Sequence, residues 1–335
     1  MKSLVVLLGL IAVAVSVAVV TKHLGMAPEW VCETTEAGWQ PRDSQGELVY
    51  DNHLWILGGW YSPQEPNPRD VWKSLDGRKW TRVVEIAPWE HSDLSAVVVF
   101  DGKMWLMGGR KLPSNECSNQ VWSSTDGVDW KLETNCAGWC PRVAASFTVF
   151  KDKVWILGGT GDFYDHSEAM VKNDVWSSVD GVVWELMTPD ADWPKRAHAQ
   201  AVVFDDKIWI MGGGAWHPQH VPLNDVWCSE DGVNWALVTE AAPWKPRLWF
   251  SLVVYRDRMW VLGGWSKENG NFGDVWYTKD GKNWEELSSE TIWSRRHEHS
   301  AWVFRDRIWV AGGYADSLNN EVWSLDVART WFKEQ

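Results

Sequence analysis

A Gly-Gly pair that recurs six times is the feature that most constrains how this chain can fold. Successive pairs are 49 to 54 residues apart, and each pair ends a short apolar segment that contains a tryptophan. A unit repeated at this length predicts a repeat protein, in which each unit covers its apolar faces with its neighbours. The pairs begin at Gly58, Gly108, Gly158, Gly212, Gly263 and Gly312.

Each unit contains the same short motifs in the same order. An apolar run that ends in Phe or Tyr (strand a) precedes the segment that ends in Gly-Gly (strand b). Strand c begins at an acidic or amide residue followed by Val-Trp. In the first five units strand d follows Asp-Gly-x-x-Trp, as at Asp76 to Trp80. The a–b and c–d connections are short and contain Asp and Gly, which tolerate the positive φ of a tight turn.

Strand b is apolar at every position, which is typical of a strand covered on both faces. Four-stranded units buried on both faces predict the blades of a propeller. The sequence therefore predicts an all-β, six-bladed propeller with four antiparallel strands per blade over residues 30–335. The length of 335 residues alone would suggest about two domains, and the repeat overrules that expectation.

These residues resemble the Kelch family, also called galactose-oxidase-like propellers. The resemblance rests on Gly-Gly, on Trp72 thirteen residues after Gly59, on Trp80 eight residues further, and on Pro-Arg at the start of strand a, as in Pro41-Arg42. It covers about residues 30 to 335, with tryptophan where many Kelch repeats have tyrosine. The family includes protein-binding modules, a copper oxidase, sugar mutarotases and nitrile specifiers, so the resemblance implies the fold without fixing a function.

The chain begins with an uncharged and mainly apolar segment, Leu4 to Val20, which follows Lys2. The segment is long for the core of a signal peptide and at the short limit of a membrane span. We expect residues 1–22 to be a signal peptide or a signal-anchor and residues 23–29 to be a linker. Both alternatives place the propeller outside the cytoplasm (secreted, periplasmic or lumenal), with membrane contact only through this segment.

The first residues of the propeller repeat the pattern of a strand d. Trp30-Val31-Cys32-Glu33-Thr34 matches the register of residues 130–134 in the second unit, whereas the C-terminus offers only a poor strand d near Trp331. We expect the N-terminal strand to pair with strand c of the sixth unit, because this closes the ring and removes an open edge.

Tryptophan is the abundant residue type, with 30 copies against 6 tyrosines and 9 phenylalanines. Most tryptophans occupy repeated positions and are expected to pack between and within blades. Strand direction reverses at each turn, so the b–c and d–a connections share one side of the ring, the loop-rich face, and the a–b and c–d turns share the other, the tight-turn face. Five tryptophans lie outside the repeat, at positions 60, 216, 249, 265 and 302; we expect Trp302 in the core and the other four on the loop-rich face.

Long loops on a rigid ring are where binding usually resides. The first hypothesis is therefore a non-catalytic module that binds a protein or a glycan through the loop-rich face; the alternative for these aromatics is that they merely cover the rim. The formal net charge of −13 argues against nucleic acid and favours neutral or cationic partners. We expect a monomer. The candidate recognition residues are Trp60, Tyr61, Arg110, Phe163, Tyr164, His166, Trp216, His217, Trp249, Trp265 and Tyr314.

A sugar-acting enzyme is the second hypothesis, based on the resemblance to the six-bladed sialic-acid mutarotases of the class. Such an enzyme would move a proton to a ring oxygen at the mouth of the channel, with Arg296, Glu298 and His299 as its residues. A structural envelope protein without a small ligand is the third alternative.

An arginine opens strand a, and an acidic residue opens strand c, in the same five units. Ser92 and Gln120 replace the two charges in the second unit. An arginine can reach the acid across the Gly-Gly end of strand b, so we favour structural ion pairs over a ring of arginines for an anion. The expected pairs are Arg42–Asp70, Arg142–Asp174, Arg196–Asp225, Arg247–Asp274 and Arg296–Glu321.

No cofactor or metal is predicted from the sequence. His297 and His299 could chelate from one strand face, and His217 and His220 from one loop, but neither pair has a third ligand at a characteristic spacing. The chain has five cysteines. A disulfide among Cys117, Cys136 and Cys140 is left open, because these residues lie on connections of the same face.

Overall fold

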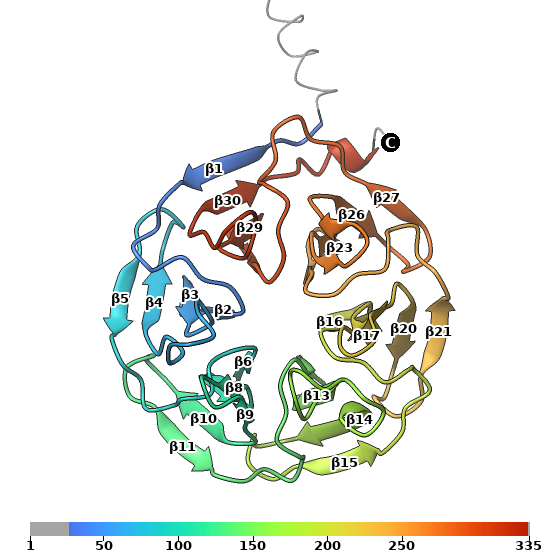
Figure 1. Ribbon diagram of the computed structural model, residues 1–335. Helices are drawn as coiled ribbons and strands as arrows, with labels where there is room; N and C mark the ends of the chain where they lie inside the picture. Colours follow the sequence, from blue (N-terminus) through green and yellow to red (C-terminus); the bar gives the residue numbers. More distant parts are fainter. Residues whose placement is uncertain (1–26, 334–335) are drawn as a thin grey trace, which may run out of the picture.

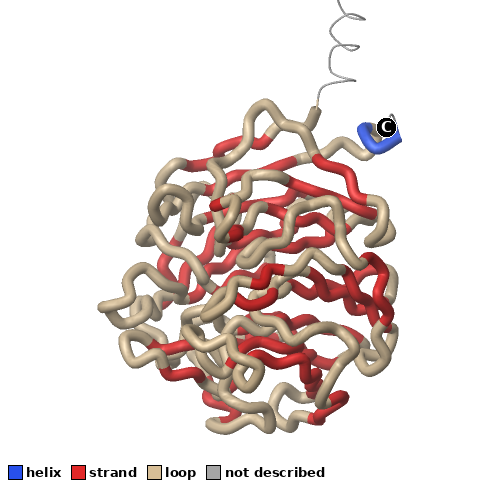
Figure 2. The backbone as a smooth tube through the Cα atoms, turned by 45° about the vertical axis from the view of Figure 1, so that its right-hand side comes forward, coloured by secondary structure: helices blue, strands red, loops and turns tan. Residues whose placement is uncertain are grey.

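The computed structural model describes residues 27–333, which form six four-stranded antiparallel sheets around a central axis (Figure 1). The six-bladed propeller predicted from the repeat is confirmed. In each blade strand a is innermost, and the strands follow one another outward toward the rim. The innermost strands of neighbouring blades contact one another around the axis. A view turned by 45° shows strands and loops, with one short helical turn beside the C-terminus (Figure 2).

The strands have the following bounds. Blade 1 contains β2 (Gly46–Tyr50), β3 (His53–Leu57), β4 (Val71–Ser74) and β5 (Thr81–Val84). Blade 2 contains β6 (Ala96–Phe100), β7 (Lys103–Met107), β10 (Val121–Ser124) and β11 (Lys131–Thr134). Blade 3 contains β12 (Ser146–Phe150), β13 (Lys153–Thr160), β14 (Val171–Ser178) and β15 (Glu185–Thr188). Blade 4 contains β16 (Gln200–Phe204), β17 (Lys207–Met211), β20 (Val226–Ser229) and β21 (Ala236–Thr239). Blade 5 contains β22 (Ser251–Val254), β23 (Met259–Leu262), β26 (Val275–Thr278) and β27 (Trp284–Glu286). Blade 6 contains β28 (Ser300–Phe304), β29 (Arg307–Ala311), β30 (Val322–Leu325) and β1 (Trp30–Thr34).

Three b–c connections form small hairpins of their own on the loop-rich face. These hairpins pair β8 (Arg110–Lys111) with β9 (Glu116–Cys117), β18 (Gly214–Ala215) with β19 (Val221–Pro222), and β24 (Trp265–Ser266) with β25 (Gly270–Asn271).

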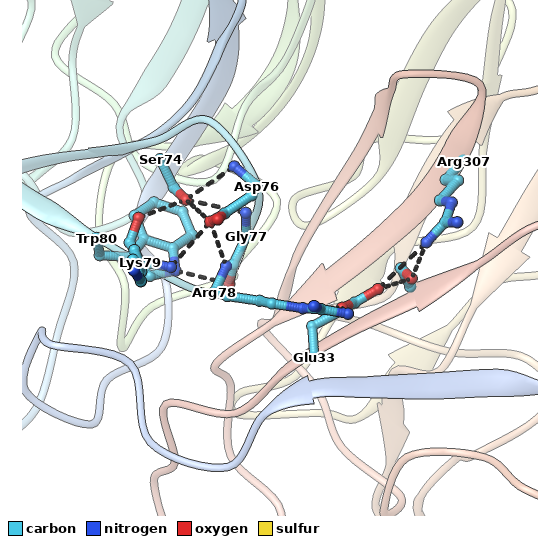
Figure 3. A network of polar contacts seen from close by, with 9 residues as sticks. Glu33, Ser74, Asp76, Gly77, Arg78, Lys79, Trp80 and Arg307 are labelled. Atoms are coloured by element: carbon cyan, nitrogen blue, oxygen red, sulfur yellow. Dashed lines mark hydrogen bonds and ion pairs between the residues drawn. The ribbon is translucent and has the colours of Figure 1, made fainter.

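The N-terminal strand closes the ring as expected. β1 pairs antiparallel with β30, with Trp30 opposite Leu325, and so supplies the strand d of blade 6. Glu33 of β1 ties this blade to the next, because it accepts hydrogen bonds from Ser324 at 2.7 Å in blade 6 and from Arg78 at 2.6 Å in blade 1 (Figure 3). Arg307 lies 3.3 Å from the same carboxylate.

The C-terminal residues take over a packing role that blade 6 would otherwise lack. In five blades the glycine of the Asp-Gly turn sits against the strand-b tryptophan of the adjacent blade, as Gly77 does against Trp309. Blade 6 has no such turn, because its strand d comes from the N-terminus. The short helix η1 (Trp331–Lys333) instead places Phe332 beside Trp260, with ring centroids 6.1 Å apart.

The c–d turns are held by their own side chains. In blade 1, Asp76 accepts hydrogen bonds from the backbone N–H groups of Arg78 and Lys79, both at 2.9 Å (Figure 3). Trp80 donates its indole N–H to the carbonyl of Gly77, whose φ of 71° suits glycine. This local chemistry explains why the motif recurs as Asp-Gly-x-x-Trp.

Tryptophans form most of the large buried side chains. Each d–a tryptophan packs edge-on against the strand-d tryptophan of its own blade, with centroids 5.8 to 6.1 Å apart, a favourable aromatic geometry. The pair in blade 6 is Trp293 with Trp30, so β1 reproduces this contact too. Trp302 is buried, as expected.

The predicted signal segment, residues 1–22, and most of the predicted linker lie outside the described residues. Within residues 27–333 no helix is both long enough and apolar enough to cross a membrane.

Candidate functional site

Six residues that precede the innermost strands form a ring around the loop-rich end of the axis. All six have positive φ, between 50° and 57°, although none is glycine. Backbone hydrogen bonds join neighbouring blades here, for example from Leu94 N–H to Ser44 carbonyl and from Glu298 N–H to Trp249 carbonyl. Left-handed conformations at non-glycine residues often mark functional positions, and here they recur once in every blade. Its members are Ser44, Leu94, Ala144, His198, Trp249 and Glu298.

A second pair of positions surrounds this inner ring in every blade. The residue before each inner-ring member forms a β-bridge with the residue directly after Gly-Gly. The bridges bring the b–c connections to the mouth of the channel, where they add large side chains. The bridged pairs are Asp43 with Trp60, Asp93 with Arg110, Val143 with Thr160, Ala197 with Gly214, Leu248 with Trp265, and His297 with Tyr314.

A hollow of about 290 Å³ lies at this mouth. Seven of the eleven recognition residues expected from the sequence line it, namely Trp60, Arg110, Phe163, Tyr164, Trp216, Trp249 and Tyr314. Its other lining residues are Asp43, Ser44, Asp93, His297 and Glu298. A second cavity of about 220 Å³ shares Ser44, Trp249 and Glu298 with the hollow. It extends along the innermost strands, where Glu47 is among its lining residues.

The remaining four expected residues lie around the hollow without lining it. Trp265 packs behind Trp249, with centroids 5.2 Å apart. His166 is buried and stacks on His198 at 5.4 Å. Tyr61 is half-buried and His217 is exposed on its loop.

Blades 6, 1 and 2 contribute an acidic wall to the hollow. Asp43, Asp93 and Glu298 line it together, and Arg110 is the cationic side chain among its lining residues. Arg110 donates its Nε–H to Asp93 at 2.6 Å and stacks on the Phe163 ring at 3.7 Å. Arg110 is therefore buried and engaged with Asp93, so it differs from the exposed recognition side chain that its loop position suggested.

The sequence reasoning did not find Asp43 and Asp93. The position that follows the repeated place of the arginine (Ser92 in blade 2) is acidic in blades 1 and 2 and in no other blade. That departure from the repeat was a usable signal. It was masked by the stronger regularity of the preceding arginines.

Burial raises the pKa values of all three carboxyl groups, and repulsion between carboxylates adds to the shift at Asp43 and Glu298. For Asp43 the causes are burial, then the charges of Glu298 and Asp93, and its pKa lies well above the usual range. Burial and then Asp93 raise the pKa of Glu298 to about 8. Burial also raises the pKa of Asp93, although the neighbouring Arg110 lowers it. The acidic wall thus has less positive charge nearby than its carboxylates need.

His297 borders the acidic wall as a neutral ring. Asn271 donates its amide N–H groups to the carbonyls of Tyr314 and Ala315, so its oxygen faces His297 Nδ1 at 2.6 Å and that nitrogen carries the proton. Burial lowers the pKa of His297 to about 4. The 3.7 Å approach of His297 Nε2 to Glu298 is therefore not an ion pair at neutral pH.

Blades 3, 4 and 5 contribute an aromatic wall. The Trp216 ring lies 5.5 Å from Phe163, 6.0 Å from Tyr164 and 6.0 Å from Trp249. Trp216 is fixed by a hydrogen bond of 3.0 Å from its indole N–H to the Phe163 carbonyl. The hollow therefore has carboxylates on one side and aromatic rings on the other.

Of the three residues of the enzyme hypothesis, Glu298 and His299 both line the second cavity, whereas Arg296 is kept apart from them. Arg296 is fully buried and donates to Glu321 at 2.6 Å and to Asn319 at 2.8 Å, and it lines neither the hollow nor the second cavity. His299 lines the second cavity with its ring 5.3 Å from Trp293, and burial lowers its pKa well below the usual value. Only Glu298 reaches the hollow.

The five arginine–acid pairs occur where the sequence suggested, with shortest N–O distances of 2.5 to 2.7 Å. Each arginine also donates to the carbonyl of the first glycine of Gly-Gly at 2.7 to 3.0 Å. Each acid in addition accepts from the strand-c tryptophan, as Asp174 does from Trp176 at 2.8 Å. Burial tends to raise the pKa of Asp174, but hydrogen bonding and attraction by Arg142 have the larger effect, so the pKa lies below its usual value. These arginines are occupied within the protein, which fits a structural role.

Among residues 27–333 no group of three or more His, Cys, Asp or Glu side chains could hold a metal ion. All five cysteines are free thiols, including Cys117, Cys136 and Cys140.

Comparison with known proteins agrees with the architecture. The family model described as the KLHDC2/KLHL20/DRC7 Kelch-repeats domain matches residues 44–239, more than half of the chain. A search of curated proteins found no match to the chain. Kelch propeller domains generally mediate protein interactions. Together with the six blades, the match shows that this chain belongs to the Kelch-repeat family.

Proposed function

We propose that this protein is a non-catalytic binding module that docks a partner protein on its loop-rich face, with the hollow at the channel mouth as the centre of the contact. One observation carries the proposal: three of the five tryptophans outside the repeat converge, with aromatic rings of the b–c connections, on one hollow of about 290 Å³. Concave sites with aromatic anchors and a few polar groups are typical of recognition sites.

The two faces of the ring differ in a way that supports this assignment. On the loop-rich face, Tyr164 and Tyr314 keep 45% and 38% of their surface exposed beside the hollow. The exposed apolar residues of the tight-turn face, such as Val128 and Val183, are spread over separate c–d turns. Scattered single apolar residues are ordinary for a protein surface, whereas clustered aromatics around a hollow indicate an interface.

The enzyme hypothesis receives less support. That hypothesis needs Arg296 beside the ligand, yet this side chain is fully buried, is bound to Glu321 and lines neither cavity. A glycan remains the alternative ligand class for the same face, since aromatic rings offer flat apolar surfaces.

The test is a comparative capture experiment with the full-length chain. The loop-face variant combines Trp60→Ala, Tyr164→Ala and Tyr314→Ala, and the matched control combines Val128→Ala and Val183→Ala on the tight-turn face. Captured proteins are quantified by mass spectrometry. We expect the wild type and the control to retain a set of proteins that the loop-face variant loses. Equal retention by all three proteins would contradict the proposal. A glycan array probed with the same three proteins would reassign the ligand class if glycans alone followed this pattern.

We further propose that residues 1–22 direct the propeller out of the cytoplasm and that it works as a monomer. Both proposals rest on the sequence alone. Fractionation of cells that express the chain with and without residues 1–22 tests the location; analytical ultracentrifugation tests the monomer.

A further inference from the structure

The acidic wall of the hollow is short of hydrogen-bond donors as well as of positive charge. Asp93 is 1% exposed and lines the hollow, and its Oδ1 has no hydrogen-bond partner among residues 27–333. Asp43 receives a hydrogen bond of 3.2 Å from the Ser44 hydroxyl. A buried carboxylate oxygen without a donor is costly, and such atoms call for an explanation.

The charges on the wall do not balance. Three carboxyl groups, Asp43, Asp93 and Glu298, face one guanidinium, that of Arg110, and this guanidinium already contacts Asp93. The nearby His297 is neutral, because burial lowers its pKa to about 4. A cation entering the hollow would favour the ionised forms of Asp43 and Glu298, whose pKa values are raised, and its N–H groups would supply the missing donors.

The opposite wall suits the same kind of group. Trp216, Trp249 and Tyr164 line the hollow, and the faces of such rings attract cations. The geometry is already used once within this site, where the Arg110 guanidinium lies 3.7 Å from the centre of the Phe163 ring.

We propose that the hollow binds one cationic side chain, a lysine or an arginine, that projects from the partner protein. The ammonium or guanidinium lies against Asp43, Asp93 and Glu298, and the aliphatic stem lies along the Trp216 and Trp249 rings. This inference rests on the proposed function, because it names the group by which a partner would be recognised on the loop-rich face. The net charge of −13 draws such a partner toward the protein.

The probe is a short peptide with blocked ends, of sequence Gly-Ser-X-Ser-Gly, in which X is lysine, arginine, acetyl-lysine, norleucine or glutamate. Its binding to the full-length chain is measured by titration calorimetry or by ligand-observed NMR. We expect the lysine or the arginine peptide to bind about tenfold or more tightly than the norleucine peptide, because norleucine keeps the stem and removes the charge. The ratio between lysine and arginine identifies which of the two cations the site prefers.

Two conservative variants test the acidic wall. Glu298→Gln and Asp43→Asn keep the shape of each side chain and remove its charge. Each is expected to reduce the preference for lysine over norleucine toward unity while the affinity for norleucine stays within about twofold. Trp216→Ala is the matched aromatic variant and should weaken both peptides together. The urea midpoint of each variant shows whether the propeller is folded.

Equal binding of the lysine, acetyl-lysine and norleucine peptides to the wild type would overturn the inference without any variant. A lysine preference that survives in both Glu298→Gln and Asp43→Asn would overturn it as well. Failure here is distinguishable from failure of the proposed function. Loss of captured proteins in the loop-face variant without a lysine preference would leave the proposed function standing and remove this inference, whereas a lysine preference with unchanged protein capture would remove the proposed function.

Discussion

The substitution Asp225→Asn tests whether the buried arginine–acid pairs stabilise the blades in which they lie. Asp225 accepts from Arg196 Nη1 at 2.8 Å, from Arg196 Nη2 at 2.6 Å and from the Trp227 indole at 2.8 Å. Asparagine retains one acceptor oxygen and turns an N–H₂ group toward a donor. The Arg196 side chain, with none of its surface exposed, is then left charged and without a counter-ion. Removing one partner of a buried ion pair costs about 3–5 kcal/mol.

Urea unfolding followed by tryptophan fluorescence measures this cost as a shift of the midpoint at constant slope. The control is Glu230→Gln, which removes the exposed contact of Glu230 with Lys207 at 3.2 Å and should leave the midpoint unchanged. Arg196→Met and the double variant complete a cycle. The double variant should cost at least about 1 kcal/mol less than the two single variants together, because neither charge is then left unpaired. An Asp225→Asn midpoint no lower than that of the control would refute the reasoning.

The remaining predictions concern the hollow and the closure of the ring. Burial and Asp93 raise the pKa of Glu298 to about 8, and the cation binds the ionised form of this carboxyl group. Affinity for the lysine peptide should therefore rise by up to about tenfold per pH unit from pH 6 to 8 and then level off. An affinity that stays constant over this pH range would contradict the assignment. The same raised pKa means that the folded state holds a proton that the unfolded chain releases near pH 4, so the contribution of Glu298 to stability is lost as pH rises toward 8. Glu298→Gln should therefore raise the urea midpoint at pH 9 and leave it unchanged near pH 4, and a midpoint that falls at pH 9 would show that the carboxylate stabilises the fold. Trp30→Ala removes the contact with Trp293 and should destabilise the protein by about 3–5 kcal/mol, as for other buried tryptophans; an unaltered midpoint would mean that β1 is not needed to close the ring.

The architecture could be predicted from the sequence because each blade repeats the same local chemistry. The Asp76 turn, the arginine–acid pairs and the Gly-Gly ends are short-range or repeated features, and a repeat displays them several times. The closure by Trp30 to Thr34 was predictable for the same reason, since the segment carries the register of a strand d. The role of Phe332 over Trp260 was not predicted, because it occurs once and has no counterpart in the other blades.

The candidate site could be predicted only in part. The loop-rich face followed from strand direction, and the tryptophans outside the repeat indicated where its aromatic side chains would gather. The acidic wall was missed because the regular arginines drew attention away from the acidic residues that follow this repeated position, Asp43 and Asp93. The inner ring also has no common residue type, ranging from Ser44 to Trp249, so its shared positive φ leaves no signature in the sequence.

Photo-crosslinking of the lysine peptide to the full-length chain tests the central claim most directly. A peptide that carries a diazirine beside its lysine is irradiated with the protein, and the adducts are located by mass spectrometry. The account predicts adducts on the residues around the hollow, above all Tyr164, Trp216 and Trp249. Adducts confined to the c–d turns of the opposite face, residues 76–80 or 126–130, would contradict it.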